Sequence, residues 1–414
     1  MDHQKAKNKL TQVIFLSQSI FSAGTVTLFT VLSISAFELS GQESFAGLPH
    51  SILIFTPALT AYFMRSLMNR ISWRFGLTLG YIMGALGAVI GVWAIFNNSF
   101  YPILISAFFF GTARASGDLS RYAVGQMFEE SKRARMIGRV VFASAIGGVV
   151  GPLIAPLSSK LAANIGLPPD SGTWGLAGFL YLLAGLVTLT FLYPDPNKVA
   201  RGLGHISEEK VIGKIPSKVS FIKSFKLPLV QLAFSSMVIS QLVMVVLMVM
   251  TPLHIHKLHY GNEVIGYVIA AHTLGMFGLA ALTGYLVDKF GHVPMMFVGG
   301  LILASSVILA PMTTSGVVLA ISLFLLGLGW NFGYVAGSSL LSSSLPNEVR
   351  SKIQGIIDSL IAFIAGLSSL GSGPLFAMGG YFALSMAGLL VTILLMILIY
   401  FLSRQHKVKS SLSF

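Results

Sequence analysis

The segment Gly284-Tyr-Leu-Val-Asp288-Lys289-Phe-Gly291-His292 is a short polar turn between two long apolar runs, 264–287 and 294–312. A helix needs roughly 20 apolar residues to cross about 30 Å of hydrocarbon. Each run is close to that length, and charged side chains such as Asp288 and Lys289 are costly to place in lipid. The segment therefore predicts a loop between two membrane-spanning helices, and the same pattern continues along the chain.

Twelve apolar runs of this kind occur, six on each side of a polar stretch at 194–226. They are predicted at 13–37, 49–68, 77–97, 101–125, 137–158, 175–193, 229–252, 264–287, 294–312, 316–343, 353–377 and 381–402. The first run is too long for a signal peptide and shows no small-residue cleavage site, so we expect an uncleaved helix. The prediction is an all-α integral membrane protein with twelve transmembrane helices.

The composition agrees with a membrane protein and excludes several other classes. Of the 414 residues, 54% are hydrophobic and 10% are charged, whereas an average soluble domain is about 25% charged. The absence of Cys excludes disulfides, thiolate zinc sites, iron–sulfur clusters and cysteine nucleophiles. The sequence contains no Walker loop, no His-Glu-x-x-His motif and no dinucleotide fingerprint after a strand. We therefore expect no cofactor and no enzymatic activity.

The positive charge of the chain reports on its topology. If the twelve runs are spans, 23 of the 27 Lys and Arg residues fall on the side that holds both termini, and only Lys160 and Lys257 fall on the other side. Cytoplasmic loops collect Lys and Arg, so we expect both termini in the cytoplasm and the protein in the cell membrane, plasma or inner. This topology explains the net charge of +13 without a nucleic-acid partner. We expect a monomer.

The polar stretch between the sixth and seventh runs divides the chain into parts. We predict a six-helix bundle at 1–193, a cytoplasmic linker at 194–226, a second six-helix bundle at 227–402 and a cytoplasmic tail at 403–414. The linker is rich in Pro, Gly and basic residues, a composition typical of connecting segments. A short amphipathic helix within it is compatible with this composition.

Two pairs of loops indicate that the second bundle repeats the first. The loops 133–138 and 350–355 both read basic-x-basic-x-x-Gly and lie 217 residues apart. The dipeptide Asn69-Arg70 occupies the place of Asp288-Lys289, 219 residues earlier. In transporters, repeats of this parallel kind are related by a pseudo-two-fold axis, and the substrate binds near mid-membrane between the halves.

The polar turn resembles the signature Gly-x-x-x-Asp-Arg/Lys-x-Gly-Arg/Lys of the major facilitator superfamily. Gly284, Asp288, Lys289 and Gly291 stand in the matching positions, and His292 replaces the final cation. The resemblance implies two six-helix bundles that move a small molecule by alternating access. It also implies that Asp288 contacts a helix N-terminus and a neighbouring Arg, which would hold one conformation.

The fifth run carries a second resemblance. Gly147, Gly151 and Pro152 resemble the Gly-x-x-x-Gly-Pro motif of proton-coupled antiporters in the same superfamily. This resemblance implies efflux of a drug or metabolite with the proton as coupling ion. The Arg that drug antiporters carry four residues before a Gly in the fourth span is Ala107 here, so the usual proton-coupling residue is absent.

The first-half copy of the polar turn departs from the signature. Asn69 replaces the Asp and Ser72 replaces the Gly, although Arg70 and Arg74 remain. Because Asn carries no charge, we expect this copy to contribute a hydrogen bond at most.

The fourth run contains Arg114, Asp118 and Arg121 at positions i, i+4 and i+7. This spacing places all three on one helical face, with Asp118 within reach of both cations. Ionisable residues within spans face the bundle interior or water and are candidates for function. Asp118 is then a proton-titratable gate, and Arg114 binds an anionic substrate group or acts as a counter-ion. The alternative is a structural cluster, with Arg121 extending to the membrane surface.

Two further carboxylates lie near the ends of predicted spans. Asp358 lies near the start of the eleventh span, where the helix dipole stabilises an acid; the functional alternative is a second carboxylate facing the cavity. Glu38 follows the first span on the outer side, either as an outer proton port or as an ordinary loop residue.

Four more side chains are polar or amphipathic at membrane depth. They are Gln18, His272, Trp330 and Asn331. Each is compatible with lining the substrate cavity, and each is equally compatible with hydrogen bonding between helices. The run His254, His256 and His259 has spacings i, i+2 and i+5, which do not share a helix face, so we expect no metal site.

The sequence thus favours proton-coupled export of a small organic molecule. The alternatives are a nutrient facilitator or symporter, a lipid exporter, or, from another class, a membrane sensor or enzyme that transports nothing. A sensor or enzyme of this kind would be expected to carry a large soluble domain, and the longest polar segment here is 194–226.

Overall fold

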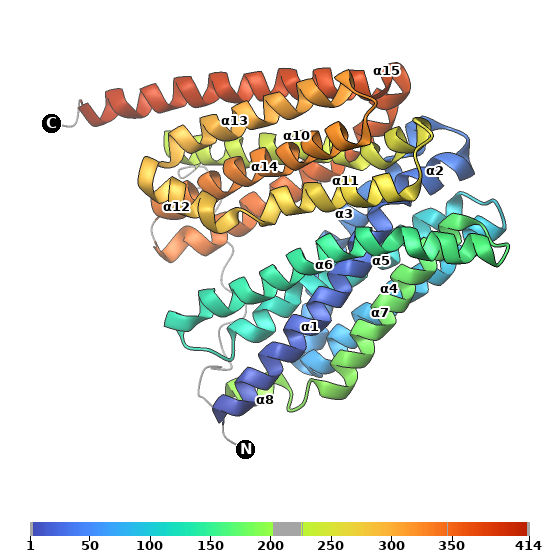
Figure 1. Cartoon of the computed structure of the whole chain (residues 1–414). Helices are drawn as coiled ribbons and strands as arrows, with labels where there is room; N and C mark the ends of the chain where they lie inside the picture. Colours follow the sequence, from blue (N-terminus) through green and yellow to red (C-terminus); the bar gives the residue numbers. More distant parts are fainter. Residues whose placement is uncertain (1–2, 202–224, 226, 346, 412–414) are drawn as a thin grey trace. The chain divides into compact units, whose positions relative to one another are not determined.

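The structure, a computed structural model, describes residues 3–201, 225, 227–345 and 347–411, and the regular secondary structure of these residues is entirely helical (Figure 1). The helices of the first half are α1 (His3–Phe29), α2 (Leu32–Ser40), α3 (Leu48–Arg70), α4 (Trp73–Phe96), α5 (Tyr101–Gly125), α6 (Glu130–Asn164), α7 (Pro169–Phe191) and α8 (Pro196–Arg201). Those of the second half are α10 (Pro228–Lys257), α11 (Asn262–Phe277), α12 (Ala280–Phe290), α13 (His292–Leu309), α14 (Gly316–Ser344) and α15 (Asn347–Ser411).

Ten stretches of the described residues are long and apolar enough to cross a membrane. One of them, Ile353–Arg404, has 52 residues and contains two of the predicted spans. A further predicted span, α5, is 25 residues long but carries Arg114, Asp118 and Arg121, which lower its hydropathy. With α5 added and the long stretch counted twice, the structure accounts for all twelve predicted spans.

The last two spans are joined by a sharp kink rather than by a polar loop. Gly379 (φ −158°, ψ 23°) and Gly380 (φ 61°, ψ −154°) leave the helical conformation within α15. The conformation of Gly380 is one that only glycine adopts readily. Two glycines at this point therefore let the chain turn between the predicted spans 353–377 and 381–402.

Several helix limits differ from the apolar runs. The first run, predicted at 13–37, corresponds to two helices that begin at His3, break at Thr30–Val31 and continue to Ser40. The eighth run is interrupted between α11 and α12, and α6 extends well beyond 137–158 at both ends. Hydropathy measures which residues prefer lipid, so it detects neither a backbone break within an apolar run nor a helix that continues into polar sequence.

The described residues divide by contacts into two compact units. One comprises residues 3–201 and 255–270, and the other comprises the described residues of 225–254 and 271–411. The predicted limits at 193 and 227 stay a prediction. Most of the predicted linker lies outside the described residues; its first residues form the short helix α8.

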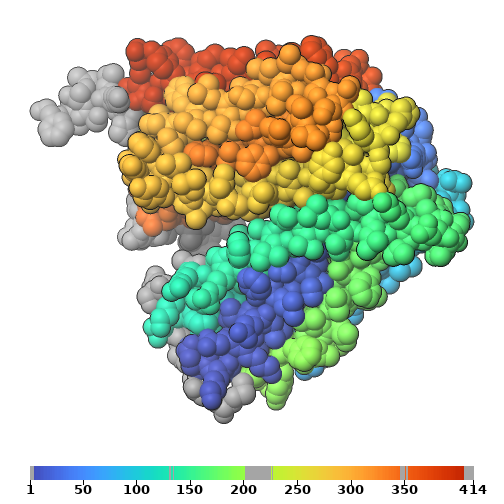
Figure 2. Space-filling model, viewed as in Figure 1, coloured from blue at the N-terminus to red at the C-terminus, as the bar shows by residue number. Residues whose placement is uncertain are grey.

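In the first unit, small residues let helices approach closely. On α4, Gly84 and Gly91 face the rings of Tyr181 and Trp174 of α7, which are fully buried. On α6, Gly147 and Gly151 lie against the backbone of α1, and Figures 1 and 2 show these two helices side by side. Small residues serve this purpose in membrane proteins generally.

The second unit uses the same device. Gly299 of α13 lies against the backbone at Gly329 and Gly333 of α14. Beside this contact, the hydroxyl of Ser306 donates a hydrogen bond to the Ser322 carbonyl at 2.7 Å, which ties the two helices together.

Candidate functional site

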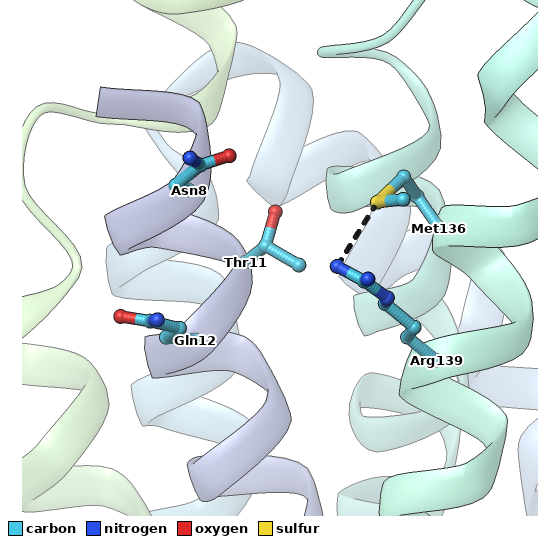
Figure 3. A pocket seen from close by; sticks show the side chains of 5 residues that line it. All are labelled: Asn8, Thr11, Gln12, Met136 and Arg139. Atoms are coloured by element: carbon cyan, nitrogen blue, oxygen red, sulfur yellow. Dashed lines mark hydrogen bonds between the residues drawn. The ribbon is translucent and has the colours of Figure 1, made fainter. Parts of the chain in front are cut away.

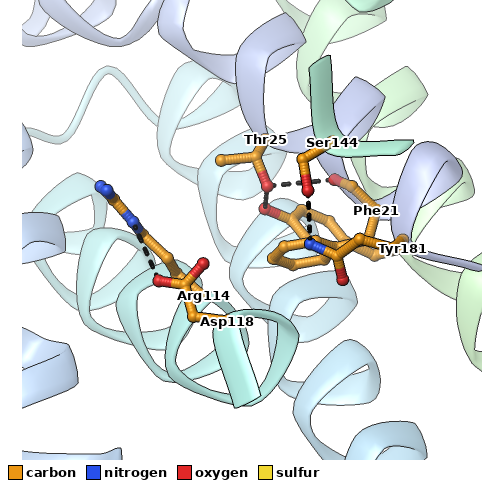
Figure 4. Close-up of polar contacts among 7 residues, drawn as sticks. Phe21, Thr25, Arg114, Asp118, Ser144 and Tyr181 are labelled. Carbon is orange, nitrogen blue, oxygen red and sulfur yellow. Dashed lines mark hydrogen bonds and ion pairs between the residues drawn. The ribbon is translucent and has the colours of Figure 1, made fainter. Parts of the chain in front are cut away.

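The charged face of α5 forms an ion pair that other residues of the protein do not bury. Arg114 Nε lies 3.7 Å from Asp118 Oδ2, and the two side chains are 39% and 56% exposed (Figure 4). The i, i+4 spacing brings the pair together as the sequence indicates. An exposed pair of this length contributes at most about 1 kcal/mol to stability, so a proton or a ligand can separate it at little cost.

Asp118 and Arg121 line a groove between α3 and α5. The groove has a volume of about 320 Å³, and its other lining residues are Pro57, Ala61, Tyr62, Arg65, Ala115, Leu119 and Tyr122. The guanidinium groups of Arg65 and Arg121 lie 5.5 and 5.1 Å from the centre of the Tyr122 ring. Both distances are in the range of cation–π contacts. Sequence spacing gave no sign of this arrangement, because Arg65 comes from a different helix.

Gln18 lies in a hydrogen-bonded layer between α1, α5 and α6. Its Nε2 donates to Ser144 Oγ at 3.0 Å, and its Oε1 accepts from Ser120 Oγ at 2.9 Å. Close by, Thr25 and Tyr181 share a hydrogen bond of 3.0 Å (Figure 4). Gln18 is 4% exposed, so in this structure it joins helices, which is one of the two alternatives that the sequence left open.

Glu38 lies within α2 and pairs with a residue far away in the sequence. Its Oε1 is 3.3 Å from His256 Nε2, in a segment that belongs to the same compact unit. Lys160 pairs with Glu263 at 2.7 Å, and Lys257 pairs with Glu43. Glu38 is therefore neither an isolated loop residue nor a buried acid, and its partner is an imidazole that can itself bind a proton.

The candidates of the second unit are engaged in helix contacts. His272 is buried, with Nδ1 3.0 Å from the Leu323 carbonyl. Asn331 donates to the Met276 carbonyl at 2.6 Å. Trp330 donates to Gln241 Oε1 at 2.8 Å and stacks on Tyr334. Stacking and hydrogen bonding fix these side chains, whereas the α5 pair is held loosely.

The loop signature is built around one glycine. Gly291 has φ 90° and joins α12 directly to α13. Lys289 lies over the rings of Tyr285 and Phe290, and His292 Nε2 is 3.1 Å from Ser339 Oγ. Asp288 makes no hydrogen bond or ion pair with any residue that the structure describes. The latch implied by the resemblance stays a prediction.

The first-half copy of the loop is held by two residues that the sequence did not single out. Asp195 accepts from the backbone N–H of Arg74 at 3.2 Å, and Arg74 Nε donates to the Leu189 carbonyl. Asn197 accepts from Trp73 Nε1 at 2.8 Å and donates to the Met68 carbonyl at 3.1 Å. The sequence signal was present in the tetrapeptide Pro-Asp-Pro-Asn at 194–197, where α8 begins, because Asp and Asn commonly bond to backbone at such positions.

The remaining candidates are placed as follows. Asn69 and Arg70 lie at the end of α3, Asp358 lies exposed on α15, and Gly284 lies in α12 with open space around it. His254 stacks on Tyr381 with ring centres 4.3 Å apart. No group of three His, Cys, Asp or Glu residues suited to a metal ion occurs among the described residues.

A second, smaller pocket lies between α1 and α6. It has a volume of about 190 Å³ and is lined by Asn8, Thr11, Gln12, Met136 and Arg139. Figure 3 shows Arg139 and Met136 of α6 opposite Thr11 of α1, with Arg139 Nη1 3.9 Å from the Met136 sulfur. This pocket has one cation and no aromatic wall.

Long apolar helices that pack through close glycine contacts define an all-α multi-pass membrane protein. The chain matches the family model of the Major Facilitator Superfamily over residues 14–261 and 232–413, and it belongs to this superfamily. The fold of the chain is accordingly that of two six-helix bundles. Members of the superfamily bind small-molecule substrates, and the protein is a member of this transporter family and not an enzyme.

Similar proteins carry transporter names. The chain is 33% identical to the uncharacterized MFS-type transporter YdeG of Bacillus subtilis (strain 168), covering 95% of this chain and 92% of the relative. It is 23% identical to the riboflavin transporter RfnT of Brucella anthropi, covering 89% of each. It is 24% identical to a multi-drug resistance efflux pump PmrA homolog of Lactococcus lactis, covering 87% and 85%.

A solved structure is similar in fold. The crystal structure of a bacterial homologue of the human lysosomal transporter Spinster, in an inward-facing and occupied conformation, matches with a TM-score of 0.73 at 14% identity. The match covers 95% of this chain and 96% of that one. At this identity the similarity concerns the fold alone.

Proposed function

We propose that this transporter exports a small organic molecule by alternating access and that an inward flow of protons drives the export. The observation that carries the proposal is the Arg114–Asp118 pair, a partly exposed carboxylate and guanidinium 3.7 Å apart in the middle of a predicted spanning helix. Carboxylates at membrane depth commonly mark proton pathways. The similarity to a multi-drug efflux pump supports the outward direction.

The mechanism follows from the weakness of the pair. With Asp118 ionised, the charge of Arg114 is compensated, and the positive charge that remains on this face of α5 is that of Arg121. A proton on Asp118 ends the pairing and leaves Arg114 uncompensated, which changes the electrostatic free energy of that face. A proton and a substrate shift an equilibrium only if they bind the two conformations differently. The proposal is that protonation favours the conformation that releases substrate outside.

The proposal includes an orientation. Both termini lie in the cytoplasm of a cell whose plasma membrane holds the protein, and the monomer is the working unit. The chain has no native Cys, so single substitutions Lys5→Cys and Lys160→Cys report orientation without a background. An impermeant maleimide applied to intact cells should label the variant at position 160 and spare the one at position 5; the reverse pattern contradicts the orientation.

The function is tested in proteoliposomes that carry the protein inside out, with ethidium, riboflavin and 2-naphthoate as probes. An inside-acid gradient should drive accumulation of the transported probe, and one pH unit per coupled proton supports about tenfold accumulation. Asp118→Asn should abolish the dependence on the gradient while exchange of probe at equal pH persists. Glu129→Gln is the matched control, because Glu129 is an exposed acid whose side chain does not cap its helix.

If the wild type transports the probe equally with and without the pH gradient, and Asp118→Asn transports it as the wild type does, proton-coupled export is wrong. A facilitator is then favoured. The similarity to a riboflavin transporter supports import of a nutrient as a second candidate. In that case riboflavin accumulates in the vesicles only when their interior is more alkaline than the medium, which is the opposite of the gradient that drives export.

A further inference from the structure

In the groove between α3 and α5, two cations lie close to one aromatic ring. Arg65 of α3 and Arg121 of α5 approach the Tyr122 ring to 5.5 and 5.1 Å. Two guanidinium groups near one ring repel each other, and the ring offsets only part of that repulsion. Such an arrangement is stabilised when an anion binds near both guanidinium groups.

Acidic side chains do not neutralise these two cations. Asp118 lines the same groove, but its carboxylate is paired with Arg114. Within the described part of the chain, no carboxylate lies within 4.0 Å of the guanidinium of Arg65 or Arg121. Arg114, for which the sequence suggested an anionic ligand, is therefore compensated, whereas the groove residues Arg65 and Arg121 are not.

The walls of the groove determine what else a ligand must carry. Pro57, Ala61, Ala115 and Leu119 are apolar, and Tyr62 adds a second aromatic side chain. A volume of about 320 Å³ is at the small end of the range of about 300–1,000 Å³ that is usual for small-molecule sites. It suits a molecule of one or two rings.

We propose that the α3–α5 groove is a binding site for an organic anion. Its carboxylate, sulfonate or phosphate binds between Arg65 and Arg121, and its aromatic or apolar body lies against Tyr62 and Tyr122. A guanidinium presents a planar fork that matches these anions with two parallel hydrogen bonds. The inference deepens the proposed function by naming the substrate class, and it rests on that function for its role in transport.

The α1–α6 pocket supplies a comparison within the same unit. Arg139 there also lacks an acidic partner among the described residues, but the pocket is smaller and its other lining residues are Asn8, Thr11, Gln12 and Met136. One cation without an aromatic wall should not retain an aromatic anion. Arg139→Gln is therefore a matched control for the loss of one Arg.

The test is calorimetric titration of the purified full-length protein in detergent micelles, with no pH gradient. The probes are 2-naphthoate and its neutral isostere 2-naphthamide. We expect naphthoate to bind and naphthamide to bind at least tenfold more weakly. Arg65→Gln and Arg121→Gln should each weaken naphthoate binding about ten- to hundredfold, as expected for the loss of a hydrogen bond between charged groups.

Two further variants separate the role of the groove from a general effect on folding. Arg121→Lys keeps the charge but loses the planar fork, so its affinity should fall between those of the wild type and Arg121→Gln. Arg139→Gln should bind naphthoate as the wild type does. The proposal is overturned if naphthoate and naphthamide bind equally, or if Arg65→Gln and Arg121→Gln bind like the wild type.

A phospholipid headgroup carries the same anionic chemistry, and a second arm distinguishes it. The titration is repeated in nanodiscs of phosphatidylcholine with and without phosphatidylglycerol. Naphthoate affinity that is equal in the two nanodiscs supports a soluble organic anion. If phosphatidylglycerol binds and requires Arg65 and Arg121 while naphthoate does not bind, the proposal is overturned in favour of the lipid. Anion binding in micelles combined with flux that ignores pH contradicts the proposed function but not this site.

Discussion

Gly151 of α6 should respond to a single added methyl group in the opposite way to Gly138 of the same helix. A Cβ at Gly151 would lie 2.9 Å from the backbone Cα and carbonyl carbon of Ala23 in α1 and closer still to its carbonyl oxygen. At Gly138, by contrast, nothing lies within 4 Å of the new atom. The two substitutions have the same effect on helix propensity and differ only in the atoms that the added methyl group contacts.

The sizes of the two effects can be worked out from these contacts. Alanine is favoured over glycine in a helix by about 1 kcal/mol, so Gly138→Ala should stabilise the protein by about that amount. Overpacking costs roughly 1–3 kcal/mol, and the upper half applies at Gly151 because backbone cannot rotate away. After the gain in propensity, Gly151→Ala should destabilise the protein by about 1–2 kcal/mol.

The assay measures the midpoint of thermal unfolding in micelles, and unfolding is monitored as the fraction of protein that remains monodisperse. Gly138→Ala should raise the midpoint and Gly151→Ala should lower it. If both raise it, α1 and α6 are not held together at this glycine, and close packing does not explain why the fifth span contains Gly147, Gly151 and Pro152. A stable Gly151→Ala protein that no longer transports would instead assign the motif to conformational change.

Three other substitutions test separate contacts. Glu38→Gln should remove a pH dependence of the unfolding free energy. The contact of Glu38 with His256 is an ion pair only while the imidazole is protonated. The wild type should therefore lose up to about 1 kcal/mol of stability as the pH rises through the imidazole range, and the variant should not. Asn197→Ala should lower the unfolding free energy by about 1–3 kcal/mol, because the buried indole N–H of Trp73 loses its acceptor. Gly380→Ala should cost about 1–3 kcal/mol, since its φ of 61° and ψ of −154° strain any residue with a Cβ.

Each of these tests has a control in the same chain. Asn164 is an exposed residue at the end of α6, and Asn164→Ala should leave the unfolding midpoint unchanged. Gly371 lies within a helical part of α15 with open space around it, so Gly371→Ala should be neutral or stabilising. A Glu38→Gln protein whose stability still varies with pH as the wild type does would show that the pair with His256 is not the source.

The fold could be predicted because a bilayer imposes a length and a composition on every spanning helix. Apolar runs located the spans even where the structure shows one helix, as at the Gly379–Gly380 kink. The break at Thr30–Val31 could not be found in this way, because both sides of it are apolar. Helix ends were missed for a related reason, since helices such as α6 continue into polar sequence.

The site could be predicted only as far as one helix carries it. The pairing of Arg114 with Asp118 follows from a spacing of four residues. The approach of Arg65 to Tyr122 and of Glu38 to His256 joins segments far apart in the sequence, and no local pattern encodes such a contact. The same limit applies to the bonds that Asp195 and Asn197 make with the α3–α4 loop.

The two halves of the repeat differ in charge, and this difference bears on where proton coupling can reside. With the 217-residue offset of the repeat, Asn331 is the residue that corresponds in sequence to Arg114, and Val335 corresponds to Asp118. Asn331 is 2% exposed and donates to a backbone carbonyl at 2.6 Å, so α14 has a buried helix contact at the position where α5 has a partly exposed ion pair. A proton changes the charge of a carboxylate and not that of an amide or a valine. If this scaffold couples transport to protons through these two repeat-related helices, α5 must therefore supply the titrating group, because neither Asn331 nor Val335 can take up a proton in its place.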